Sequence, residues 1–168
     1  MSQIHYLPLT LGFFAILVGV FVIVLILRSA VNVGGAVIPT LMSVYLLIKR
    51  ELWVKGLFAT AVVALVIHWL AAPIPGLGIA VPVFVPVLVT AVVALLLSRE
   101  DAPPLAYIAG SLGTLIGADL TNLDKVRGLG APVASIGAAG TFDGIFLTAI
   151  LAVLLASLYA RPRAARAG

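Results

Sequence analysis

Residues 117–144 have the sequence GADLTNLDKVRGLGAPVASIGAAGTFDG, and this polar, glycine-rich stretch separates the last two of several long apolar runs. It contains three of the six acidic residues, Asp119, Asp124 and Asp143, and half of the 16 glycines lie between Gly110 and Gly144. A carboxylate beside long apolar runs is unusual, because an apolar surrounding offers it neither water nor counter-ions. We therefore expect the rest of the chain to be organised around this stretch.

The composition is typical of an integral membrane protein. Hydrophobic residues make up 63% of the 168 residues and charged residues only 10%, against about 25% in a soluble domain. The absence of cysteine excludes a disulfide framework and thiolate chemistry. The net charge of +4 comes from short basic clusters between apolar runs, which indicates topology signals and a lipid bilayer as partner, not nucleic acid.

The apolar runs predict an all-α bundle of about six transmembrane helices in a single integral membrane domain that covers residues 1–168. The predicted spans are approximately residues 9–27, 31–48, 56–72, 80–97, 103–119 and 141–160. Gly34, Gly35 and Pro39 predict a kink or an unwound turn in the second span. Pro103 suits the first turn of the fifth span.

Basic residues predict the orientation of these spans. An even number of spans puts both termini on one side with seven of the ten Lys and Arg residues, whereas Arg28, Lys125 and Arg127 fall on the other side. The positive-inside rule then places both termini in the cytoplasm.

Asp119 and Asp143 are expected at equal depth in the bilayer. Asp119 lies 18 residues beyond Asp101, and Asp143 lies 18 residues before Arg161, the charges that flank the last two spans. At about 1.5 Å per residue, both lie roughly 27 Å from the cytoplasmic side, near the outer face. Two carboxylates that approach closely cannot both ionise, and a shared proton lets one act as base and the other as acid.

The two aspartates have different local settings. Asp143 falls in the first turn of the last span, where Thr141 can cap the helix and the helix dipole favours the ionised carboxylate. Asp119 ends the fifth span, where the dipole disfavours charge. A structural alternative stays open, in which Asp143 is only a helix-start acid and Asp119 only a surface carboxylate on a frayed helix end.

Arg28 and His68 are the charge partners expected near the same level. A salt bridge from Arg28 would keep one carboxylate ionised and would argue against a dyad. His68 and the two aspartates could together form a metal site of one nitrogen and two oxygens. A lone histidine within a membrane is more often a hydrogen-bonded core or interface residue, so we predict no metal and no cofactor.

Glycines predict close packing around this site. In an unbroken helix Gly110, Gly113 and Gly117 form a small-residue stripe. The backbone expected to approach Gly113 and Gly117 closely is that of the sixth or the second span. Asp119 falls about 180° from that stripe, so the helix either unwinds at Gly117 or packs on both faces. The segment 131–140 either dips back over the aspartates as a re-entrant loop or forms a surface loop.

The segments GADLTNL (117–123) and GTFDGIF (140–146) resemble a family of small prokaryotic membrane proteins known only as a domain of unknown function. The resemblance is sharpest between Gly110 and Leu147, and it implies a location in a prokaryotic cell membrane. The same segments supply the expected site-shaping residues Gly117, Asn122, Gly140, Thr141, Phe142 and Gly144.

A more distant likeness is to the diaspartyl intramembrane proteases presenilin, signal peptide peptidase and prepilin peptidase. Phe142-Asp143 resembles the Tyr-Asp pair of the first two, and Gly117-Ala118-Asp119 resembles their Gly-x-Gly-Asp motif. Ile116 and Ala118 stand where that motif has its glycines, and the two motifs occur in reversed order. The likeness implies hydrolysis of transmembrane or other peptide substrates.

These patterns predict an intramembrane aspartyl hydrolase in which Asp119 and Asp143 activate water against a peptide bond. The alternative from another class is a small ion-coupled transporter or binding protein, whose carboxylates bind a cation or a proton. The third interpretation is a structural or assembly role. A hydrolase needs carboxylates within bridging distance, a transporter needs a pathway open in turn to both sides, and a structural protein needs neither.

Overall fold

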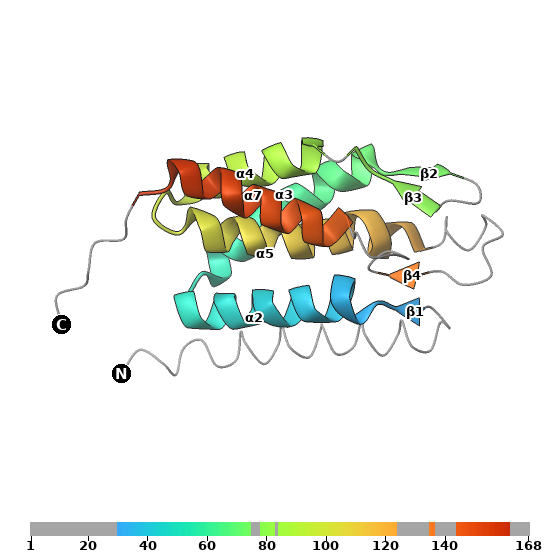
Figure 1. The fold of residues 1–168 in the computed structure, drawn as a ribbon, viewed down its shortest axis with the longest axis horizontal. Coiled ribbons are helices and arrows are strands. Elements are labelled where there is room, and N and C mark those ends of the chain that lie inside the picture. Colours follow the sequence, from blue (N-terminus) through green and yellow to red (C-terminus); the bar gives the residue numbers. More distant parts are fainter. Residues whose placement is uncertain (1–29, 75–77, 83, 124–134, 137–143, 162–168) are drawn as a thin grey trace.

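A computed structural model describes residues 30–74, 78–82, 84–123, 135–136 and 144–161 of the chain (Figure 1). Within these residues the fold is all-α, with five α-helices. They are α2 (Ile38–Arg50), α3 (Trp53–Leu70), α4 (Phe84–Leu97), α5 (Ala102–Thr114) and α7 (Gly144–Tyr159). Each helix overlaps a segment predicted as a span, and the segment 9–27, predicted as the first span, lies outside the described residues.

Two helical stretches, Val33–Arg50 and Trp53–Leu70, are long and apolar enough to cross a membrane. The apolar helices α4 and α7 are shorter. The predicted all-α fold is therefore confirmed for the described residues, and two of its helices have the length and composition of membrane spans.

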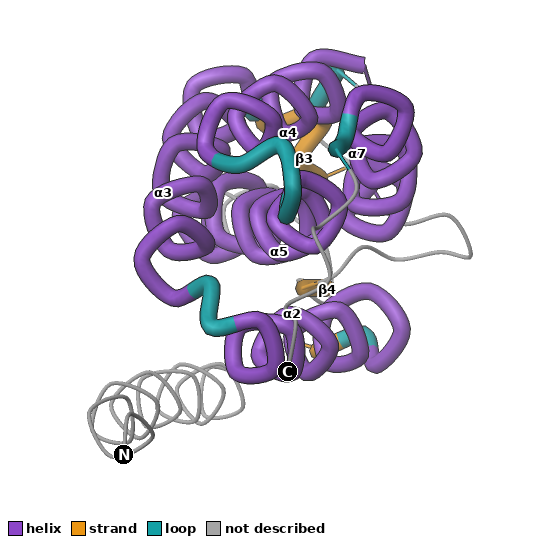
Figure 2. Tube along the Cα trace, turned by 90° about the vertical axis from the view of Figure 1, so that its left-hand side faces the viewer, coloured by secondary structure: helices purple, strands orange, loops and turns teal. Residues whose placement is uncertain are grey.

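α5 lies at the centre of the bundle, with α2, α3, α4 and α7 packed around it (Figure 2). Between Ala102 and Thr114 all residues are buried except Pro103, Pro104 and Tyr107, which are partly buried. Small residues make this possible, because they let other helices approach the α5 backbone closely. A Cβ atom on Gly110 would lie only 3.0 Å from the Cα atom of Ala149 in α7.

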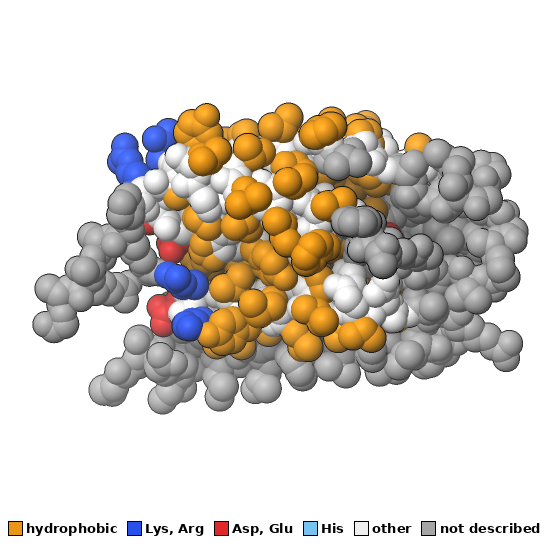
Figure 3. All heavy atoms as spheres, in the orientation of Figure 1, with side chains coloured by type: hydrophobic (Ala, Val, Ile, Leu, Met, Phe, Trp, Pro, Cys, Tyr) orange, Lys and Arg blue, Asp and Glu red, His pale blue; other side chains and the backbone are white. Residues whose placement is uncertain are grey.

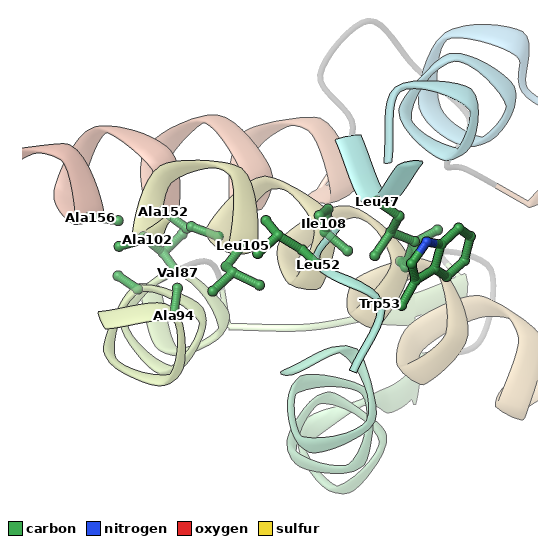
Figure 4. Close-up of a cluster of buried hydrophobic side chains, with 13 residues drawn as sticks. Leu47, Leu52, Trp53, Val87, Ala94, Ala102, Leu105, Ile108, Ala152 and Ala156 are labelled. Carbon is green, nitrogen blue, oxygen red and sulfur yellow. The ribbon is translucent and has the colours of Figure 1, made fainter. Parts of the chain in front are cut away.

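The main buried cluster contains residues of α5 and of the four helices packed around it (Figure 4). Leu105 and Ile108 of α5 are fully buried, and so is Leu47 of α2. The Trp53 ring, at the start of α3, lies in the same cluster with 4% of its surface exposed. The many alanines of α4 and α7 complete the cluster, so these helices pack on α5 at short range.

The helix starts follow the proline and glycine pattern. The expected irregularity of the second span is confirmed: Val33–Val37 form a π-helical turn before α2, and Pro39 lies at the start of α2 itself. The side chain of Asn32 caps this turn, because its Oδ1 atom accepts from the amides of Gly34 (2.9 Å) and Gly35 (3.2 Å). Pro103 lies in the first turn of α5, as predicted.

The fourth span begins later than predicted. It was predicted to begin at residue 80, but Ala80 ends the strand β3 (Gly78–Ala80), which pairs antiparallel with β2 (Ala72–Ile74), and α4 begins at Phe84. The physical reason is Pro82, which holds the residue before it in an extended conformation and so delays the helix.

Charged side chains gather at one end of the bundle (Figure 3). This end contains the α2–α3 connection, the α4–α5 connection and the residue that follows α7. The amide of Arg161 donates to the carbonyl oxygen of Arg99 (2.9 Å), which ties the end of α7 to the α4–α5 connection. The exposed basic residues here are Lys49, Arg50, Lys55, Arg99 and Arg161.

Candidate functional site

The candidate site lies at the other end of the bundle, where α5 ends. After Thr114 the helix continues as a π-helical turn, η3 (Leu115–Asp119), and then as a 3-10 turn, η4 (Leu120–Asn122). Of the two expectations for this segment, packing on both faces is confirmed, because α5 contacts four helices. The helix does not unwind at Gly117 but changes its pitch there. π-helical turns occur frequently at functional sites.

Gly113 and Gly117 face α3. A Cβ atom on Gly117 would collide with the carbonyl oxygen of Ala64, and one on Gly113 would lie 2.6 Å from the Cγ1 atom of Val63. The predicted close approach of another backbone is therefore confirmed, but the predicted neighbour is wrong: it is the third span, not the second or the sixth. α5 has four neighbours, and Gly110 faces α7 while Gly113 and Gly117 point to α3.

Asn122 and Thr121 hold the turn from within. Asn122 is fully buried, and its Nδ2 atom donates to the carbonyl oxygens of Gly117 and Ala118, each at 3.0 Å. The Thr121 hydroxyl donates to the Gly117 carbonyl oxygen at 2.9 Å. These two side chains therefore donate hydrogen bonds to the carbonyl oxygens of the turn where the helix changes its pitch. The predicted site-shaping role of Asn122 thus has a physical basis.

His68 connects α3 to this turn. Its Nδ1 atom lies 2.8 Å from the Thr121 hydroxyl oxygen, across 53 residues of sequence. His68 is partly exposed and Thr121 is exposed, so this bond lies at the surface of the bundle end. The prediction that His68 lies near the level of the fifth span's end is confirmed.

Asp119 is the last residue of η3 and is partly buried. The residues on either side of it pack towards α7: buried Leu115 shares a cluster with Ile145, and Leu120 and Leu123 pack against that cluster. The beginning of α7 and the turn that contains Asp119 therefore share one buried cluster, which also includes Ala36 and Ile136. Gly144, the first residue of α7, is exposed, and a Cβ atom there would meet nothing within 4 Å.

Part of the segment 131–140 also returns to this end. Ser135–Ile136 (β4) pair in parallel with Ala30–Val31 (β1), and the amide of Asn32 donates to the carbonyl oxygen of Ile136 (2.8 Å). Ile136 is buried in the cluster that contains Leu115 and Ile145. The other residues of the segment lie outside the described residues.

The structure thus brings together Gly117, Asp119, Asn122 and His68 and sets Gly144 at the adjacent helix start. The remaining predicted site residues lie outside the described residues: Arg28, Gly140, Thr141, Phe142 and Asp143. The sequence analysis missed Thr121 as a site residue. The sequence feature that could have identified Thr121 is a hydroxyl side chain four residues after a glycine at a helix end. Such a hydroxyl can donate to the carbonyl oxygen of that glycine.

Residues 8–155 match the family described as "Protein of unknown function (DUF1614)". The chain belongs to the DUF1614 family. This match covers most of the DUF1614 chain and includes α2 to α5, most of α7 and the whole candidate site. The comparisons with curated proteins and with solved structures found no match. The family resemblance is therefore confirmed, and nothing found supports the likeness to intramembrane proteases.

Proposed function

We propose that this DUF1614 chain is an integral membrane protein with both termini in the cytoplasm. The support is the distribution of exposed apolar side chains, which occur on all four outer helices and not on α5. Val54 of α3 is 83% exposed, Leu96 of α4 81% and Leu158 of α7 75%. Soluble proteins rarely expose so much apolar surface, whereas a bilayer covers it favourably. The six-span topology belongs to the same proposal.

Within this membrane protein, the proposed activity is hydrolysis of a peptide bond by Asp119 and Asp143. The observation that supports it is the buried cluster of Leu115 and Ile145, against which Leu120 also packs. These residues flank the two aspartates in sequence, so the end of α5 and the start of α7 are held side by side. A rigid scaffold of this kind suits a pair of catalytic groups.

The proposed step uses one ionised and one protonated aspartate. The carboxylate, assigned to Asp143 at the helix start, takes a proton from water as the water oxygen attacks the peptide carbonyl carbon. The acid, assigned to Asp119, gives its proton to the carbonyl oxygen. When the C–N bond breaks, Asp143 gives its proton to the departing nitrogen. Asp119 then accepts a proton from one hydroxyl of the tetrahedral intermediate, which becomes the new carboxyl group. The pair then again shares one proton.

The ion-coupled alternative has less support at this turn. Broken helices in transporters commonly offer free main-chain carbonyl oxygens to a cation. Here the carbonyl oxygen of Gly117 already accepts from Asn122 and Thr121, and that of Ala118 accepts from Asn122. The tight contact of Gly117 with α3 also opposes sliding of these helices.

The test is cleavage of a transmembrane peptide by the full-length chain reconstituted in liposomes. Asp119→Asn and Asp143→Asn should each abolish cleavage, and the double variant should be no worse than either, because groups that act as one unit lose function non-additively. Asp124→Asn, in the same stretch, is the matched control and should retain activity. Cleavage by either single variant at the wild-type rate rules out the dyad.

The alternatives give other results with the same variants. An ion-coupled protein should show no cleavage, and Asp119→Asn should shift the ion dependence of uptake or binding. A structural salt bridge with Arg28 predicts loss of stability in an Asp→Asn variant, partly restored when Arg28 is also neutralised.

A further inference from the structure

One hydrogen-bond chain at the bundle end determines where a proton must lie. The His68 Nδ1 atom is 2.8 Å from the Thr121 hydroxyl oxygen, and that oxygen is 2.9 Å from the Gly117 carbonyl oxygen. A carbonyl oxygen only accepts, so the hydroxyl gives its single proton to Gly117. The Thr121 oxygen therefore accepts from the His68 ring, and Nδ1 is the donor.

We infer that His68 is a positioning residue of the candidate site, with its proton on Nδ1 and its basic lone pair on Nε2. A neutral imidazole has one N–H group, so a proton fixed on Nδ1 leaves Nε2 as the acceptor. The charged imidazolium keeps the Nδ1–H group. His68 can thus take up a proton at Nε2 without breaking its bond to Thr121.

The bond matters because Thr121 lies two residues from Asp119. Asn122 fixes the turn from within, and His68 fixes it from α3, so the position of Asp119 depends on two helices instead of one. The link from this geometry to hydrolysis rests on the proposed function, whereas the assignment of the proton does not.

Few charges surround His68 among the described residues. Of the elements packed against α3, α4 has no ionisable residue, the turn η3 has Asp119, and α5 has Tyr107 in its middle. Lys49 and Arg50 of α2, Lys55 of α3 and Asp101 at the start of α5 lie at the opposite end of the bundle, and α2 also carries Tyr45. A proton on Nε2 therefore adds a positive charge to the end that contains Asp119.

The test uses nitrogen NMR on the full chain labelled with ¹⁵N-histidine in detergent micelles. The chain has two histidines, so His5→Gln leaves His68 as the single labelled ring. The neutral ring should carry its proton on Nδ1, with Nε2 bare. A neutral ring with its proton on Nε2 overturns the inference.

Substitutions at Thr121 check the cause of this assignment. Thr121→Ser keeps the hydroxyl and should keep the proton on Nδ1. Thr121→Val has the same shape without the acceptor, and the ring proton should then redistribute towards Nε2. If Ser and Val give the same distribution, Thr121 does not hold the ring and the inference fails.

Substitutions at His68 check the positioning role. His68→Asn places an amide donor where Nδ1 lies, whereas His68→Leu has none. Loss of one hydrogen bond should lower Tm by roughly 2–4 °C in a chain of this size, so Leu should show this loss and Asn should not. Equal Tm values for the two variants overturn the positioning role. Because NMR and Tm do not require peptide cleavage, failure of the hydrolase proposal is distinguishable from failure of this inference.

Discussion

The backbone of Gly117 lies directly against that of Ala64, so that a methyl group on Gly117 would overlap the Ala64 carbonyl oxygen. This contact fixes the depth of α5 relative to α3 within η3, the turn that contains Asp119. It also brings Thr121 within hydrogen-bond distance of His68. The position of the candidate site therefore depends on Gly117. The close contact with Ala64 explains why the sequence has a glycine there.

Gly117→Ala should lower the free energy of unfolding by about 1–3 kcal/mol, because the new methyl group forces two main chains apart. The matched control is Gly144→Ala, where the new methyl group meets nothing within 4 Å. That variant should be neutral or stabilising by up to about 1 kcal/mol, since alanine favours helices. Denaturant unfolding in mixed micelles measures both, and equal values would contradict the close contact.

Asn122→Asp should destabilise the chain by at least about 2 kcal/mol, because a buried carboxylate would face the two carbonyl oxygens to which Asn122 now donates. The loss should be larger at pH 8 than at pH 4, since a protonated carboxyl group can still donate one bond. Asn32→Asp is the control: its Oδ1 atom accepts from two amides, which aspartate does equally well. We expect a change within about 1 kcal/mol there. Similar losses at both positions would refute the donor role of Asn122.

Glu51→Gly should stabilise the chain by about 0.5–1 kcal/mol. Glu51 ends α2 with φ 55° and ψ 38°, a left-handed conformation that costs little for glycine and more for other residues. Glu51→Ala keeps the Cβ atom and should give no such gain. Thermal unfolding of the two variants, side by side with the wild type, checks the difference.

Single cysteines can test the proposed orientation, because the chain has no cysteine of its own. Lys55 and Ala72 lie just inside and just beyond opposite ends of α3, and both are exposed. In intact cells a membrane-impermeant thiol reagent should label Ala72→Cys and should reach Lys55→Cys only after lysis, because basic residues favour the cytoplasmic side. The reverse pattern would invert the topology and the predicted depth of both aspartates.

The sequence was sufficient to locate the described helices but not to predict which helices pack against each other. Apolar runs and prolines located the helical segments to within a few residues, because burial and proline geometry act locally. The glycine stripe also predicted a close contact correctly. Its partner, α3, could not be predicted, since four helices surround α5 and the stripe alone does not say which of them approaches.

The candidate site was predictable only where residue type determines the role. Asn122 and Gly117 were identified from the motif, and each has a structural reason in the described turn. The bond between His68 and Thr121 joins residues 53 positions apart, and it depends on the register of α3 against α5. The strands β2 and β3 were not predicted, because their apolar residues match the helical runs on either side.

The central position of α5 has a consequence for how the chain is made. The helices of a membrane protein enter the bilayer in the order in which the ribosome makes them. Among the described helices, α5 is not one of the two that are long and apolar enough to cross a membrane alone. When α5 emerges, α2 to α4 are already present, but α7, which covers Gly110, has not yet been synthesised. In the proposed topology α5 is thus surrounded by other helices instead of lipid, and its remaining side is covered only after α7 has been synthesised. A nascent chain that ends after residue 123 should therefore remain exposed to insertion chaperones and quality-control proteases.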